Sequence, residues 1–256
     1  DCEGGDRKSL DLPFGQDKLI DALLKANKNT AVVLLSGNAV AMPWVEKVPA
    51  IMQGWYLGSE AGNALVDVIS GDVNPSGKLP FSFPKKLEDN AAQSFGKLSY
   101  PGDGVNVYYK EDILVGYRWF DTKKIEPLFP FGYGLSYTSF AYSKPSVDKT
   151  ELTADGTVKV TFTLTNSGKV DGAETVQLYV SKPKSEVERA AKELKAFQKV
   201  FLKAGESQTV TLEVPASSFA YYNEAKHDWT VEPGSYTLLL GSSSRDIKGK
   251  MTLNVK

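Results

Sequence analysis

The stretch Val158-Lys-Val-Thr-Phe-Thr-Leu164 decides the fold of the second half of this chain, because its apolar and polar residues alternate strictly. Successive side chains of a β-strand point to opposite faces, so this stretch predicts a strand with one buried face and one face in water. Val210-Thr-Leu-Glu-Val214 alternates in the same way, and Tyr236-Thr-Leu-Leu-Leu240 is apolar at every second position. The second half of the chain is therefore predicted to be all-β.

Turn sequences separate these runs, and they contain the glycines that tight turns need. They are Asp155-Gly156, Asn166-Ser-Gly168, Ala204-Gly205 and Glu232-Pro-Gly234. About seven short strands at this spacing are typical of an immunoglobulin-like or fibronectin type III-like β-sandwich. Tyr236, which closely follows the Pro-Gly pair, predicts a tyrosine corner. We expect residues 140–256 to form this sandwich.

The first part of the chain alternates between helix and strand patterns. Leu19, Ile20, Leu23 and Leu24 share one face of a predicted helix over residues 16–26. Residues 31–36 and 50–56 are continuous apolar runs, which are typical of strands buried on both faces.

A second helix is predicted from Ser59, as its N-cap, to Gly71 just past its end. Residues 79–83 are predicted to be a third strand. This order indicates an α/β domain with a mostly parallel sheet. Because typical sheets have about five or six strands, we expect residues 1–84 to be the C-terminal part of such a domain.

Residues 85–139 differ from both flanking parts, because prolines, glycines and aromatic residues dominate them. Large rings rarely remain in water, so this segment is predicted to be a long connection packed on a surface.

The composition excludes several classes of function. The 256-residue chain has a net charge of −1, which leaves no basic surplus for nucleic acid. Its apolar runs are too short to cross a membrane. It has one cysteine, Cys2, and one histidine, His227, so an intrachain disulfide is impossible and a Cys/His zinc site is not expected. We expect no metal and no cofactor, and carboxylates as the agents of any chemistry.

Glu3-Gly-Gly-Asp-Arg7 is the candidate catalytic segment that remains after other motifs fail. Two glycines permit a sharp, accessible loop, in which Asp6 and Arg7 would shift the pKa of Glu3 in opposite directions. Taken alone, the same residues are better explained as a solvated terminal loop.

Several longer motifs, in the same order, resemble the glycoside hydrolases of family 3, a group that contains many β-glucosidases. The resemblance covers the acid/base loop, the second domain, the connecting segment and the fibronectin-like tail of that family. The motifs are Glu3-Gly-Gly-Asp-Arg-Lys-Ser-Leu-Asp-Leu-Pro13, Gly54-Trp-Tyr-Leu-Gly-Ser-Glu-Ala-Gly-Asn63, Gly71-Asp-Val-Asn-Pro-Ser-Gly-Lys-Leu-Pro80, Val115-Gly-Tyr-Arg-Trp-Phe-Asp121, Phe129-Pro-Phe-Gly-Tyr-Gly-Leu-Ser-Tyr-Thr138, Glu193-Leu-Lys-Ala-Phe197, Leu202-Lys-Ala-Gly-Glu206 and Glu232-Pro-Gly-Ser-Tyr236.

The resemblance implies a retaining enzyme that acts on β-glucosides or β-glucosyl oligosaccharides. Glu3 matches the general acid/base, while Asp6 and Arg7 match supporting positions in its loop. The family's nucleophile, an aspartate, belongs to an N-terminal barrel that this sequence lacks, so the chain alone is expected to be inactive. The alternative is a non-catalytic carbohydrate-binding or scaffolding protein built from the same two domains.

The resemblance also gives expectations about packing and location. Trp119 and Phe120 are predicted to pack against the barrel or a partner subunit, which makes a homodimer plausible. Trp55 and Tyr56 are predicted to be core residues, and the sandwich shows no row of aromatic residues that would indicate polysaccharide binding. The expected location is the periplasm or the outside of a bacterial cell.

Overall fold

The computed structural model describes residues 4, 5 and 7–256, which form two compact units. The first, called here the N-terminal unit, contains the chain up to residue 73 together with residues 83–108 and 126–128. The second, called the sandwich unit, contains residues 74–82, 109–125 and 129–256. The segment predicted as a connection, 85–139, therefore contributes to both units.

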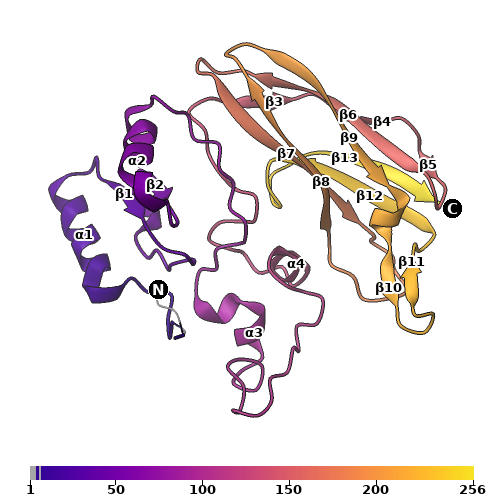
Figure 1. Cartoon of the computed structure of the whole chain (residues 1–256), viewed down its shortest axis with the longest axis horizontal. Coiled ribbons are helices and arrows are strands. Elements are labelled where there is room, and N and C mark those ends of the chain that lie inside the picture. Colours follow the sequence, from indigo (N-terminus) through magenta and orange to yellow (C-terminus); the bar gives the residue numbers. More distant parts are fainter. Residues whose placement is uncertain (1–3, 6) are drawn as a thin grey trace. The chain divides into compact units, whose positions relative to one another are not determined.

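The N-terminal unit has an α/β arrangement (Figure 1). Strands β1 (Ala31–Leu34) and β2 (Ala50–Gln53) pair in parallel, with Ala31 opposite Ala50. The helices of this unit are α1 (Gln16–Ala26), α2 (Ala61–Ser70) and α3 (Ala91–Ser94), and its 3₁₀ turns are η1 (Pro13–Gly15), η2 (Val45–Lys47), η3 (Gly58–Glu60) and η4 (Leu87–Asp89). This part of the fold class is confirmed.

The predicted start of the second helix is wrong, and its predicted end is confirmed. Ser59 is not an N-cap, because a 3₁₀ turn precedes the helix and Glu60 occupies the capping position. Gly71 ends α2 with a φ of 87°, a left-handed conformation that glycine adopts without strain.

The predicted third strand at residues 79–83 is wrong. The main chain of Leu79 instead pairs with the segment 132–133, since its N–H donates to Tyr133 O at 2.8 Å and its carbonyl accepts from Gly132 N at 2.8 Å. The apolar run therefore fastens residues 74–82 within the sandwich unit and does not extend the parallel sheet. Asn74 adds to this attachment, because its Nδ2 donates to Asp171 O and its Oδ1 accepts from Tyr137 N.

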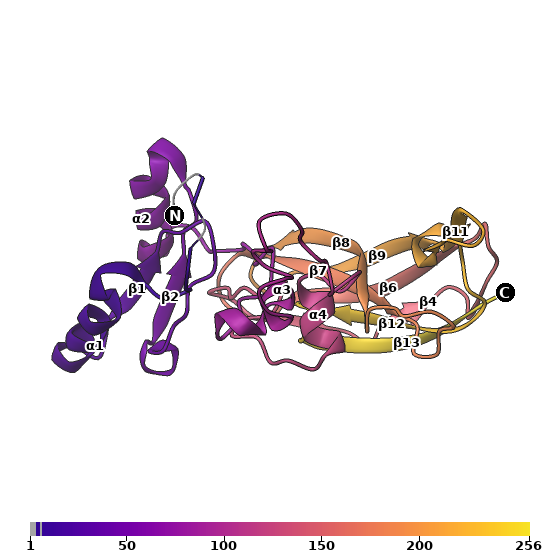
Figure 2. The same ribbon diagram turned by 90° about the horizontal axis from the view of Figure 1, so that it is seen from below.

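The sandwich unit consists of two facing sheets (Figures 1 and 2). The five-stranded sheet has the order β5-β13-β12-β7-β8, and the other contains β3, β6 and β4, with β9 also paired to β6. The bounds are β3 (Phe140–Tyr142), β4 (Ser146–Val147), β5 (Glu151–Leu152), β6 (Thr157–Asn166), β7 (Gly172–Ser181), β8 (Glu193–Leu202), β9 (Ser207–Pro215), β12 (Gly234–Gly241) and β13 (Ile247–Val255). A separate hairpin joins β10 (Tyr221–Asn223) and β11 (Asp228–Thr230). The predicted β-sandwich is confirmed.

The core of the sandwich follows the alternation in the sequence. Val158, Val160, Phe162 and Leu164 on β6 are buried, whereas Lys159 between them is exposed and Thr161 and Thr163 are partly buried. Tyr236 forms the predicted tyrosine corner, since its hydroxyl donates to Glu232 O at 2.7 Å and the side chain is completely buried. The sandwich thus has its own hydrophobic core.

Helix α4 (Tyr117–Thr122) packs within the sandwich unit. The Tyr117 ring stacks on Phe131 at a centroid distance of 4.7 Å and meets the edge of Tyr179 at 5.9 Å. Trp119 and Phe120 are only 5% and 3% exposed. The prediction that these two residues pack against another domain or subunit is wrong, because their own chain already covers them.

Among the described residues, no helix combines the length and the apolar character needed to cross a bilayer.

Candidate functional site

The candidate site is the loop that contains Glu3, Asp6 and Arg7. Glu3 and Asp6 lie outside the described residues, and Arg7 lies inside them. The neighbouring Gly4 and Gly5 are exposed to solvent. Gly4 has a φ of 72°, and a Cβ added there would meet no atom within 4 Å. Glycine is therefore favoured at this position by backbone conformation and not by lack of space.

Arg7 fastens the loop to the body of the N-terminal unit. Its Nη2 donates to Asp11 O at 2.9 Å, and its Nη1 donates to Ala39 O at 3.4 Å. One main-chain bond reinforces this attachment, because Ala41 N donates to Leu10 O at 2.8 Å. Arg7 and Leu10 are thus both attached to the segment 39–41.

The segment that receives the loop is itself firmly packed. Val40 and Trp44 are 1% exposed, and Met42 is 5% exposed. The indole Nε1 of Trp44 donates to Asp17 Oδ1 at 2.7 Å, which satisfies the buried polar end of this ring and joins it to α1. The segment to which Arg7 is attached is therefore well supported by its own unit.

The two aromatic residues that follow β2 have different environments. Trp55 meets the edge of Phe83 at a ring distance of 6.0 Å, with half-buried side-chain surface. Tyr56 is 73% exposed, so the prediction that it belongs to the core is wrong. Its ring lies over Gly37, where an added Cβ would be 2.6 Å from Tyr56 Cε2.

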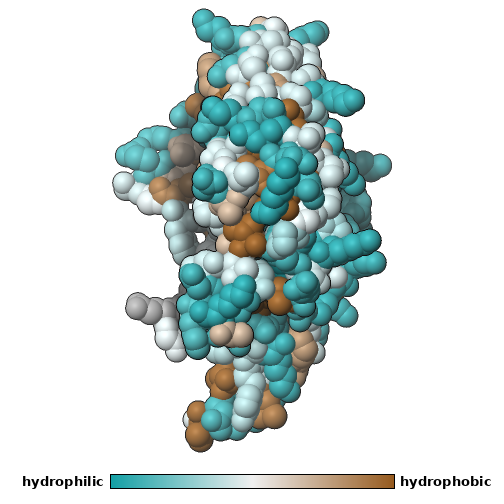
Figure 3. All heavy atoms as spheres, turned by 90° about the vertical axis from the view of Figure 1, so that its right-hand side faces the viewer, coloured by the Kyte–Doolittle hydropathy of each residue, from teal (hydrophilic) through white to brown (hydrophobic). Residues whose placement is uncertain are grey.

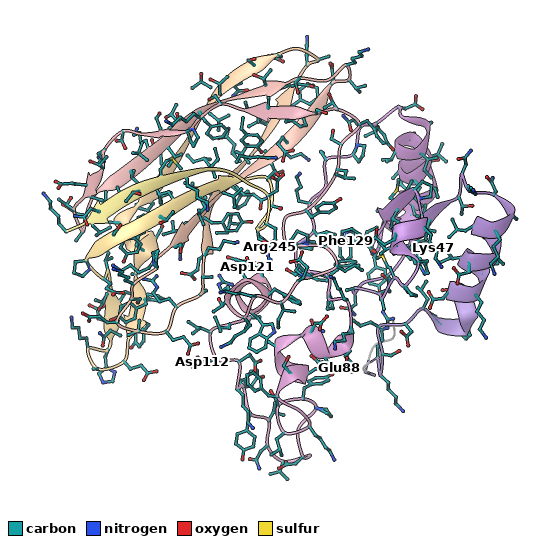
Figure 4. All side chains as sticks on the ribbon, turned by 180° about the vertical axis from the view of Figure 1, so that it is seen from behind. Lys47, Glu88, Asp112, Asp121, Phe129 and Arg245 are labelled. Carbon is teal, nitrogen blue, oxygen red and sulfur yellow. The ribbon has the colours of Figure 1, made fainter. Side chains whose placement is uncertain are left out.

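A second group of charged residues lies in the sandwich unit, and sequence reasoning missed it. Asp121 on α4 is 3% exposed at its side chain and pairs with Arg245 Nε and, at 3.1 Å, with Lys192 Nζ. Figure 4 shows Asp121 and Arg245 close together beside α4. Arg245 Nη2 also donates to the carbonyls of Phe120 and Ile125. The carboxylate is thus enclosed by two cations, an arrangement that fastens α4 and leaves no group poised for acid/base chemistry.

Lys78 and Glu174 form another ion pair in the sandwich unit, with 3.0 Å between Nζ and Oε1. Both side chains are largely buried, and burial raises the pKa of the Glu174 carboxyl above its ordinary value in spite of the nearby ammonium group. Lys78 Nζ also donates to Gly134 O at 2.9 Å. This pair holds residues 74–82 in place and has a structural role.

Within residues 4, 5 and 7–256, no group of three His, Cys, Asp or Glu side chains is arranged to hold a metal ion. The one histidine, His227, lies exposed in the turn between β10 and β11 with a φ of 52°.

Comparisons with known proteins give a consistent result over almost the whole chain. Residues 1–137 match the model of the glycosyl hydrolase family 3 C-terminal domain, and residues 174–244 match a fibronectin type III-like domain. The chain is 53% identical over 252 residues to a protein of Bacteroides ovatus named beta-glucosidase BoGH3A. The aligned region covers 98% of this chain and 34% of that protein. It is 48% identical over 255 residues to thermostable beta-glucosidase B of Acetivibrio thermocellus, covering 100% of this chain and 33% of that protein.

A solved structure shows the same fold. The crystal structure of DesR, a beta-glucosidase from Streptomyces venezuelae in complex with D-glucose, matches with a TM-score of 0.94 and 45% identity. The match covers 99% of this chain and 32% of that one. The chain therefore spans about a third of the length of the relatives that it matches.

Proposed function

The chain belongs to glycoside hydrolase family 3, and from this premise we propose that it is the C-terminal part of a retaining β-glycosidase. The enzyme removes terminal β-D-glucosyl residues from oligosaccharides or glycosides. The observation that carries the proposal is the match of residues 1–137, which include Glu3, to the C-terminal domain of the family. The relatives named beta-glucosidase indicate the substrate class.

Glu3 is the general acid/base of this proposal. Its carboxylic acid donates a proton to the glycosidic oxygen while a nucleophilic carboxylate attacks the anomeric carbon, so the aglycone leaves as an alcohol. The Glu3 carboxylate then removes a proton from water, which attacks the glycosyl-enzyme ester and releases the sugar with its β configuration. The cycle restores the protonated Glu3 and the free nucleophile.

Features of the N-terminal unit support a positioned loop. Two guanidinium nitrogens of Arg7 are used on the carbonyls of Asp11 and Ala39, which suits Arg7 to shaping the loop. Gly4 has a left-handed backbone, and its exposed surroundings leave room for a substrate beside the loop. Asp6 is proposed as the second supporting residue.

The nucleophile of the proposed reaction comes from an N-terminal barrel. Exposed apolar side chains on the N-terminal unit support the proposal that this unit is completed by more protein. They are Leu19, Leu35, Val66 and Ile69, whose exposures range from 58% to 62%. The chain alone is accordingly expected to leave aryl β-glucosides intact. The predicted homodimer and the predicted location in the periplasm or outside a bacterial cell stay predictions, which sedimentation and cell fractionation would test.

The role of Glu3 can be tested by Glu3→Gln in the enzyme completed with its barrel. We measure kcat/KM, which reports bond cleavage to the aglycone, for methyl β-D-glucoside and for 2,4-dinitrophenyl β-D-glucoside. The methyl glucoside needs a proton on its leaving oxygen and should slow by about 10²–10⁴-fold. The dinitrophenolate leaves unaided, so its kcat/KM should change by less than about tenfold.

Glu46→Gln is the matched control, because Glu46 is an exposed glutamate of the same unit outside the proposed site. It should leave both substrates unaffected. Equal slowing of the two substrates by Glu3→Gln would remove Glu3 from the acid/base role. Turnover of aryl β-glucosides by the chain alone would contradict the need for a barrel.

A further inference from the structure

The β10–β11 hairpin carries an exposed aromatic pair that the proposed catalytic reaction does not use. In the hairpin, Tyr222 lies directly opposite Trp229. The hairpin lies at the end of the sandwich that holds the C-terminus (Figures 1 and 2). The exposures of Tyr222 and Trp229 are 50% and 68%. By contrast, Trp44 and Trp119 are 1% and 5% exposed, so Trp229 differs sharply from these two tryptophans.

The hairpin fixes the position of the Trp229 ring. The Trp229 N–H donates to Asp228 Oδ1 at 2.7 Å. Trp229 and Tyr222 are directly opposite each other in the antiparallel hairpin, so their side chains lie on the same face. The two rings meet edge to face at 5.7 Å and 77°, a favourable geometry for aromatic pairs. Tyr222 thus supports the Trp229 ring from the neighbouring strand.

Trp229 also lines a surface depression of about 710 Å³. The depression is open to solvent, so a ligand bound there would keep one face in water. The polar residues that line it are Ser217, Lys226, Asp228 and Thr230. The depression therefore combines one large aromatic surface with hydroxyl groups, an ammonium group and a carboxylate.

This combination favours a neutral ligand that has both an apolar face and many hydroxyl groups. Lys226 and Asp228 carry opposite charges, so the depression has no net charge that would select an anion or a cation. Their groups, with the hydroxyls of Ser217 and Thr230, offer donors and acceptors suited to sugar hydroxyls. The side of the chain seen in Figure 3 is mostly hydrophilic with small hydrophobic patches, which is unlike a large apolar protein interface.

We propose that the depression beside Trp229 is a non-catalytic sugar-binding site that takes a pyranose unit of a neutral oligosaccharide. The apolar face of the pyranose ring lies against the indole, and its hydroxyl rim meets the polar lining. The choice of a β-glucosyl oligosaccharide as ligand rests on the proposed function. The aromatic and polar lining of the site does not depend on it.

The test uses cellotetraose and the chain that carries Glu3→Gln, so that hydrolysis cannot consume the ligand. We follow the indole N–H signals of the four tryptophans by ¹H–¹⁵N NMR. The Trp229 signal should shift in a saturable manner, whereas the signals of buried Trp44 and Trp119 should stay in place. Trp229→Ala should weaken binding about tenfold or more, a loss of about 1.4 kcal/mol, because it removes the flat apolar surface against which the pyranose ring lies.

Two further variants separate stacking from general loss of structure. Trp229→Phe retains an aromatic face and should restore part of the affinity. Phe197→Ala removes another exposed ring, 67% exposed on β8, and should leave binding unchanged. Binding to Trp229→Ala is measured by calorimetry, with circular dichroism to show that the sandwich is intact.

The proposal is overturned if cellotetraose produces no saturable shift at concentrations up to about 10 mM, or if Trp229→Ala binds as tightly as its parent. These outcomes are independent of catalysis. Trp229-dependent binding in a completed enzyme that cannot cleave β-glucosides would refute the proposed function and uphold this site.

Discussion

Replacing Asp121 with Asn should destabilise the sandwich unit strongly. The substitution keeps the shape of the side chain and removes a charge that is 3% exposed, leaving Arg245 and Lys192 without their carboxylate. Breaking a buried ion pair by removing one partner typically costs about 3–5 kcal/mol. The Arg245 side chain is 30% exposed, so water screens part of the cost, and we expect about 3 kcal/mol.

Urea unfolding followed by hydrogen exchange measures this loss of stability in the sandwich unit separately from the N-terminal unit. Peptides from β7 report on the sandwich core, and a loss of about 3 kcal/mol corresponds to a midpoint shift of roughly 1–3 M urea. Glu213→Gln is the matched control, because Glu213 pairs with Lys159 at 2.7 Å with both side chains more than half exposed. It should leave the midpoint unchanged.

A double-mutant cycle then tests whether the charge pair is the cause. Arg245→Met should cost less in the Asp121→Asn background than in the original chain, since its partner is already lost. The reasoning is refuted if Asp121→Asn and Glu213→Gln shift the midpoint equally, or if the two substitutions at Asp121 and Arg245 are simply additive.

Two further predictions concern stability. Burial raises the pKa of Glu232, but hydrogen bonds from Ser185 Oγ and a main-chain N–H outweigh it, and the pKa lies below its ordinary value of 4.5. The folded state therefore binds fewer protons than the unfolded state around this pH, so the contribution of Glu232 is present above pH 4.5 and is lost as the pH falls through the lowered pKa. Glu232→Gln should reduce the acid sensitivity of unfolding measured between about pH 5 and pH 3, and an unchanged pH profile would contradict this. Gly132→Ala should destabilise the sandwich more than Gly205→Ala in thermal unfolding. Both glycines have positive φ, but only at Gly132 would the new Cβ meet another atom, Gln177 Oε1, at 2.2 Å. Equal losses of stability in the two variants would show that backbone strain alone matters.

Local periodicity predicted the elements that depend on neighbouring residues. The helix over residues 16–26 and the alternating strand around Val158–Leu164 were predictable, because the spacing of apolar residues directly gives the face that is buried. Tyr236 was predictable for the same reason, since its hydroxyl bonds to a carbonyl only a few residues away. The candidate site was found by resemblance, and the structure describes only Arg7 of its three residues.

Two of the failures concern residues whose partners are distant in sequence. Residues 79–83 look like a strand by composition, yet their main-chain partners lie at residues 128–133. Trp119 and Phe120 were predicted to pack against another domain or subunit, but residues of their own unit bury both side chains. The sequence of an apolar run or of an aromatic residue does not show which distant segment will pack on it. The spacing of apolar residues therefore could not predict these contacts.

The sequence by itself determined that this chain has an α/β part and a β-sandwich, because period and turn chemistry act over a few residues. It also indicated the family, because several long motifs occur in the chain in the same order as in that family. Only the tertiary structure decided that Asp121 is enclosed by Lys192 and Arg245, and that Trp229 lines a depression with Ser217. These contacts depend on how the long segments between them run. For Asp121, burial also strengthens the attraction to its two cations, because little water remains to screen it.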